Sequence, residues 1–117
     1  MTARTALRLL FSAILVAMLC VTTKASLVQP IWAWQGIATG NPDRWWTLAT
    51  LADAYCGFLT FYAWVFYKED GLTPRLGWLA GILLLGNIAM SIYALLQLAR
   101  LRDGEPVRHL LLRPADR

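Results

Sequence analysis

The chain has 117 residues, of which 58% are hydrophobic and only 15% carry a formal charge. Soluble domains carry about 25% charged residues, and a soluble domain this small would leave large apolar patches in water. The composition argues against a water-soluble enzyme, a disulfide-stabilised secreted module and a disordered tail, and it indicates an all-α integral membrane protein.

The first expected transmembrane helix covers residues 7–27. Its uncharged core, Leu9–Thr23, has 15 residues, and the long side chains of Arg8 and Lys24 at its two ends reach toward water and extend it. A cleavable signal peptide is the competing interpretation, because a basic region precedes the apolar core. A lysine beside the small residues of the expected cleavage site argues against cleavage, so we expect the helix to stay in the membrane.

Residues 28–45 combine proline and glycine with tryptophan, which is typical of a loop that lies on the membrane surface. Residues 46–67 form the second expected span. They contain a single charged residue, Asp53, and they have aromatic residues at both ends, where a bilayer meets water.

The third expected span, residues 76–99, is the longest charge-free segment of the chain. The 24 residues between Arg75 and Arg100 carry no formal charge. A helix of this length measures ~36 Å, which exceeds the ~30 Å of a hydrocarbon core. We therefore expect three transmembrane helices in a small bundle that forms one membrane domain, followed by a basic tail at residues 100–117.

Three spans place the N-terminus and the connection between the second and third spans on one side of the membrane. That side has four lysines and arginines, and the side of the tail has seven. The excess of basic residues in cytoplasmic loops favours a cytoplasmic tail, but the charged N-terminus resists export, so the orientation stays open. Anionic lipid headgroups explain the net charge of +4 better than nucleic acid does.

Several motifs of the second and third spans are too specific for a generic apolar helix. Together they resemble the uncharacterised domain-of-unknown-function family 1475, over nearly the whole chain. The resemblance implies a small bacterial-type integral membrane protein and brings no activity with it. The matching segments are Thr22–Leu27, Asp53–Tyr55, Gly57–Tyr62, Trp64–Val65, Tyr67–Glu69, Leu85–Met90 with Tyr93, and Leu110–Arg113.

Polar and small residues recur at helical spacing along one face of the second span and one face of the third. Such faces pack against protein, because hydroxyls and carboxylates find partners inside a helix bundle and not in lipid. We expect the faces of the three spans to meet and to form a polar cluster with a functional or a structural role. Its members are Asp53, Lys24, Asn87, Ser91 and Thr60.

Asp53 is the main candidate for function. It is expected ~10 Å below the membrane interface, where an ionised carboxylate is costly unless it is paired or hydrated. Lys24 ends the first span on the same side, so an ion pair between the two residues is expected to fit. Three roles of Asp53 remain open: a structural pair, a protonatable acid in a proton or cation pathway, and an interfacial carboxylate that reaches water. Asn87 is expected to join helices by a hydrogen bond, with substrate binding as the alternative.

Four glycines are expected to let helices approach closely: Gly57, Gly77, Gly81 and Gly86. The rest of the sequence predicts no catalytic residue, metal ligand or cofactor site. Its only histidine, His109, is in the tail, and Cys20 and Cys56 form no redox motif and are expected to be packing residues.

We therefore expect a non-enzymatic, multi-pass protein of the cytoplasmic membrane that acts through helix–helix contacts. Its partners would be the lipid bilayer and a second copy or another membrane protein, with no nucleic acid. The alternative is a minimal dimeric transporter that couples a small molecule to protons or cations through Asp53. The lack of proline in all three spans argues against that alternative, because broken helices often mark transport sites.

Overall fold

The computed structural model describes residues 2–117, and within that range every regular element is helical. The all-α class expected from the composition is therefore confirmed. The four main helices are α1 (Ala3–Val28), α2 (Arg44–Lys68), α3 (Leu72–Leu85) and α4 (Asn87–Arg100), and the three short 3₁₀ helices are η1 (Ile31–Ala33), η2 (Val107–Leu111) and η3 (Pro114–Asp116).

Two helices, α1 and α2, are long and apolar enough to cross a membrane. They have 26 and 25 residues, so each is about 38 Å long at a rise of ~1.5 Å per residue. α1 begins before the expected residue 7 because the hydroxyl of Thr2 caps it, accepting a hydrogen bond of 3.2 Å from the backbone N–H of Thr5. The segment that joins the two helices is irregular apart from η1.

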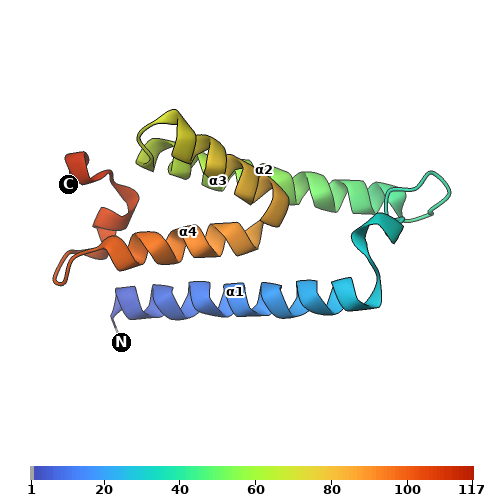
Figure 1. Ribbon diagram of the computed structural model, residues 1–117, viewed down its shortest axis with the longest axis horizontal. Coiled ribbons are helices and arrows are strands. Elements are labelled where there is room, and N and C mark those ends of the chain that lie inside the picture. The colour runs from blue at the N-terminus through green and yellow to red at the C-terminus, as the bar shows by residue number, and fades with distance from the viewer. Residues whose placement is uncertain (1) are drawn as a thin grey trace.

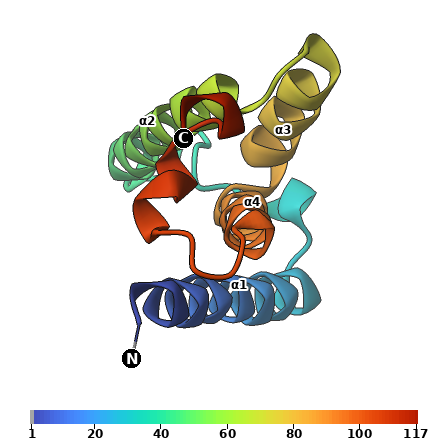
Figure 2. The same cartoon turned by 90° about the vertical axis from the view of Figure 1, so that its left-hand side faces the viewer.

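The helices form an elongated bundle with extents of 55 × 32 × 22 Å. α1 and α2 run lengthwise in opposite directions, and α3 and α4 are shorter helices that occupy only one end of the bundle (Figure 1). α4 lies in the middle and contacts α1 on one side and α2 and α3 on the other, as the view along the bundle shows (Figure 2).

The expected third span is not one helix. Residues 76–99 belong to two helices that fold back on one another at Gly86, so the prediction of one continuous helix here is wrong, and three spans are not shown. Gly86 has a φ of +54° and caps both helices, a conformation that is costly for any residue with a Cβ. α3 and α4 have 14 residues each, or about 21 Å, which is less than the ~30 Å of a hydrocarbon core.

The main core lies where α3 and α4 meet the C-terminal half of α2. Its buried residues are Val65, Ile82, Ala89 and Tyr93. Three aromatic side chains surround the Tyr93 ring edge to face, with centroid distances of 4.8 Å to Trp78, 5.4 Å to Trp64 and 6.1 Å to Phe61. Such pairs add about 0.5–1.5 kcal/mol each beyond the burial of their area, so Tyr93 joins the hairpin to α2.

The two ends of the bundle differ in how well they are covered. We call the end that holds the N-terminus of α1, the α2–α3 turn and residues 101–117 the charged end. The open end comprises residues 19–28 of α1, the loop 29–43 and the first half of α2. α4 reaches only the N-terminal half of α1 (Figure 1), and every residue from Leu19 to Val28 is exposed.

Candidate functional site

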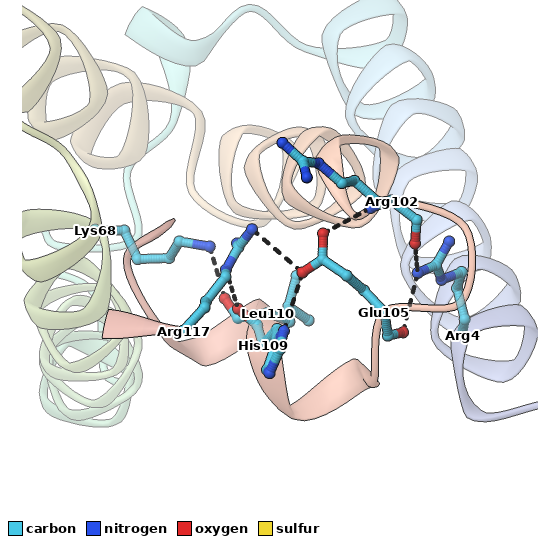
Figure 3. Close-up of polar contacts among 7 residues, drawn as sticks. All are labelled: Arg4, Lys68, Arg102, Glu105, His109, Leu110 and Arg117. Carbon is cyan, nitrogen blue, oxygen red and sulfur yellow. Dashed lines mark hydrogen bonds and ion pairs between the residues drawn. The ribbon is translucent and has the colours of Figure 1, made fainter. Parts of the chain in front are cut away.

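The charged end brings together three segments that are far apart in the sequence. The guanidinium of Arg4 donates hydrogen bonds to the backbone carbonyls of Arg102, at 2.7 Å, and Glu105, at 3.2 Å. The ammonium of Lys68 donates to the carbonyl of Leu110 at 2.7 Å. The N-terminus, the α2–α3 turn and the tail therefore share one end of the molecule (Figure 3). This overturns the expectation that the tail lies opposite the N-terminus.

The hairpin changes the distribution of charge between the two ends. With α3 and α4 both at the charged end, nine of the eleven lysines and arginines gather there and only two remain at the open end. The sequence-based division into four and seven assumed a continuous third span. The nine are Arg4, Arg8, Lys68, Arg75, Arg100, Arg102, Arg108, Arg113 and Arg117, and the two are Lys24 and Arg44.

The tail docks through both apolar and polar contacts. Leu110 is buried in a second core with Leu98 and Leu101. Around it, the side chain of Arg113 donates to the carbonyl of Tyr67 at the end of α2, and its guanidinium lies 4.0 Å from the carboxylate of Asp70. These contacts hold η2 and η3 against the ends of the helices.

Glu105 organises the polar part of the tail. Its carboxylate accepts a hydrogen bond of 2.9 Å from the backbone N–H of Arg102, and it lies 3.0 Å from Nδ1 of His109 and 3.5 Å from the guanidinium of Arg117 (Figure 3). The backbone N–H of Arg102, followed by His109, lowers the pKa of Glu105 below its ordinary value. Glu105 is thus held as a carboxylate by three donors.

A cleft of about 430 Å³ opens between the tail and the ends of α2 and α4. Its lining is strongly charged, with four basic and three acidic side chains. Among residues 2–117, the guanidinium groups of Arg100 and Arg102 take part in no hydrogen bond or ion pair. The lining residues are Lys68, Glu69, Asp70, Gln97, Arg100, Arg102, Glu105, Pro114 and Arg117.

The polar cluster expected from the sequence is not assembled. Lys24 and Asp53 are both exposed, and among residues 2–117 no ion pair joins them. Thr60 is exposed and donates its hydroxyl to the carbonyl of Cys56 in its own helix, at 2.9 Å. Asn87 is exposed at the start of α4. Only Ser91, which is 2% exposed, lies in the core.

The four glycines have different surroundings. A Cβ added to Gly57 or Gly77 would meet open space, so neither glycine is in close contact with another helix. A Cβ on Gly81 would lie 3.8 Å from Cβ of Ala89 on α4, an ordinary packing distance. A Cβ on Gly86 would lie 2.7 Å from the ring of Phe58, so this glycine is required at the turn.

The sequence does not predict the charged end, because its key acceptors are backbone carbonyls, which carry no sequence signal. One signal is present: Glu105 and His109 are four residues apart, and the apolar segment 110–112 follows them directly. That pattern predicts a short docked helical turn.

Comparison with known proteins identifies a family and nothing more. The profile of the family described as "Protein of unknown function (DUF1475)" matches residues 4–117. No curated protein and no solved structure matches the chain.

Proposed function

The chain belongs to the DUF1475 family of proteins of unknown function, and from this premise we propose that it is a non-enzymatic subunit of a membrane complex. It acts through helix–helix contacts in the cytoplasmic membrane, with a second copy of itself or another membrane protein as its partner. α1 and α2 cross the bilayer, and the α3–α4 hairpin enters part of the way from the charged end and returns.

The distribution of charge supports an orientation. Cytoplasmic segments of membrane proteins carry an excess of lysine and arginine. With nine basic residues at the charged end and two at the open end, the charged end faces the cytoplasm in this proposal. The docked tail and the N-terminus then lie on the cytoplasmic side, and the loop 29–43 lies outside.

The observation that carries the proposal is the uncovered open end. None of the 26 residues of α1 is buried, and the charged side chains of Lys24 and Asp53 are exposed in the same half of the bundle. Lipid solvates apolar residues well, but it leaves an amine and a carboxylate without partners. A neighbouring protein that covers this half would satisfy them.

The native cysteines provide a test. Cys20 is exposed on α1 within the open end, so a Cys56→Ser variant leaves one reactive thiol there. We expect mild oxidation in native membranes to give a linked species of twice the mass of the chain, or a larger one that contains a partner subunit. The matched control is a Ser91→Cys variant without other cysteines, whose thiol is buried and should not crosslink. A chain that stays monomeric in both membranes and nanodiscs would contradict the proposal.

The alternative function, proton- or cation-coupled transport, depends on Asp53. Its support is that the carboxylate is exposed on α2 and has no hydrogen-bonding or ionic partner among residues 2–117. Reconstitution in vesicles with a pH-sensitive dye tests it. Proton or cation flux that disappears in Asp53→Asn and persists in the loop variant Asp43→Asn would favour the transporter. Absence of such flux in the parent protein would contradict it.

A further inference from the structure

We propose that the cleft at the charged end binds a phosphate-bearing anion, supplied either by the headgroup of an anionic phospholipid or by a soluble phosphate compound. The lipid source rests on the membrane placement proposed above. The binding site itself goes beyond that proposal.

The first argument is the surplus of unpaired positive charge. Of the acids in the lining, Glu105 is already held by three donors and Asp70 faces Arg113. Of the lining acids, Glu69 alone is then left to balance the positive charges of Lys68, Arg100 and Arg102. Like charges that crowd around a cleft repel one another unless an anion lies between them. Guanidinium groups bind phosphate oxygens in pairs of hydrogen bonds, which makes arginine well suited to such an anion.

The second argument is the burial of Lys68. Its side chain is 7% exposed, and its ammonium group has one hydrogen-bond acceptor, the neutral carbonyl of Leu110. An ammonium group can donate three hydrogen bonds, and a buried cation is costly without an anionic partner. A phosphate oxygen in the cleft would give Lys68 both a further acceptor and a counter-charge.

The third argument comes from the layer below the cleft. The indole N–H of Trp64 and the hydroxyl of Tyr93 are buried and have no hydrogen-bond partner within residues 2–117. Trp64 and Tyr93 each precede a lining residue, Lys68 and Gln97, by one helical turn, and they therefore share its face. The ammonium of Lys68 lies 5.6 Å from the centre of the Trp64 ring. The Tyr93 hydroxyl lies near the carboxylate of Glu69, so the indole N–H of Trp64, next to Lys68, is the donor that remains without an acceptor beside the cleft.

The position of the cleft agrees with a lipid headgroup. Lys68 ends α2 and Arg100 ends α4, so the cleft lies at the level where helices leave the hydrocarbon region in the proposed placement. Basic pockets between helices on the cytoplasmic side are typical binding sites for anionic headgroups.

The experiment uses the full chain in nanodiscs and has two arms. In the lipid arm, native mass spectrometry counts phosphatidylglycerol retained from discs that mix it with phosphatidylcholine. In the soluble arm, calorimetry titrates inorganic phosphate and glycerol phosphate into the chain in discs of phosphatidylcholine alone. Retention in the first arm alone identifies a lipid headgroup, and heat of binding in the second identifies a soluble anion. No binding in either arm would overturn the proposal.

Matched charge variants separate a specific site from general attraction to a basic protein. We expect Arg100→Gln with Arg102→Gln to weaken binding about fivefold or more. Lys24→Gln with Arg44→Gln removes the same charge from the open end and should change binding less than about twofold. Equal losses of binding in the two double variants would contradict a specific site in the cleft. Arg100→Lys with Arg102→Lys keeps the charge but loses the paired donors, so we expect an intermediate loss of binding, and the melting temperature of each variant checks that a loss does not reflect misfolding. The native mass spectra also report the mass of the assembly, so a failure to form oligomers can be distinguished from a failure to bind the anion.

Discussion

The charged end and the open end are built from the same long helices, yet they differ in the number of their partners. At the charged end, α4 contributes to both cores of the molecule, together with α2 and α3 in the first and with the tail in the second. At the open end, residues 19–28 of α1 are exposed along their whole length. The buried contacts of the chain are therefore concentrated at the charged end, and the surface that we propose for a neighbouring membrane protein lies at the open end.

The first prediction, which tests this difference most directly, concerns the sides of a membrane on which the two ends lie. In a chain without its native cysteines, we expect Thr39→Cys in the loop to react with an impermeant reagent added to intact cells, and Ala115→Cys in the tail to react only after lysis. A three-span chain would place both positions on the same side of the membrane, so that either both cysteines or neither would react in intact cells. Labelling of both cysteines from outside would show that α3 and α4 do not form a hairpin when the chain is in the membrane.

The second prediction concerns the turn that keeps α3 and α4 at the charged end. We expect Gly86→Ala to lower the free energy of unfolding by about 2–4 kcal/mol, because alanine is strained at positive φ and its Cβ clashes with the Phe58 ring. Gly57→Ala is the matched control. It fills open space on α2 and should be neutral or stabilise by about 0.5–1 kcal/mol. Thermal unfolding in detergent measures both, and equal melting temperatures would show that the turn is not required.

Gly86 also shows what the sequence could and could not predict. The long apolar helices α1 and α2 were predictable because charge and hydropathy mark their ends. The hairpin was not, because a charge-free run of 24 residues looks the same whether it is straight or folded back. The glycine was visible, but a glycine inside an apolar helix is usually tolerated. What decides its conformation is packing against Phe58, which is 28 residues away in the sequence.

The site was even less predictable than the fold. Asp53 is the single charged residue within the apolar segment 46–67, and its role stays a prediction. The cleft depends instead on contacts such as that between Lys68 and the carbonyl of Leu110, which are 42 residues apart. A carbonyl acceptor is present at every residue, so no pattern in the sequence marks the one that is used.

The third prediction tests the docking of the tail through that contact. We expect Lys68→Met to keep the packing of the aliphatic chain but to leave the Leu110 carbonyl without its donor. Loss of a charged hydrogen bond of this kind costs about 1.5–3 kcal/mol, so trypsin should cleave the tail after Arg108 at least about tenfold faster. Lys24→Met removes a lysine from the open end and should leave the rate of cleavage unchanged. Equal rates in the two variants would mean that Lys68 does not hold the tail.

The smallest expected effect is the response of the tail to acid. The folded state lowers the pKa of Glu105, chiefly through the backbone N–H of Arg102 and then through His109. A carboxyl group whose pKa is lowered by folding stabilises the folded state above its ordinary pKa of about 4.3, and this stabilisation is lost as the pH falls through the lowered value.

Hydrogen exchange of residues 102–112 should therefore be slow at neutral pH and should accelerate, relative to the intrinsic rate, below about pH 4. Glu105→Gln cannot titrate, so we expect this pH dependence to disappear while α1 and α2 stay protected. The open end has no carboxylate held in this way, and its exchange should follow the intrinsic rate across the same range. If Glu105→Gln retained the acid response, the tail would be released by the protonation of a group other than Glu105.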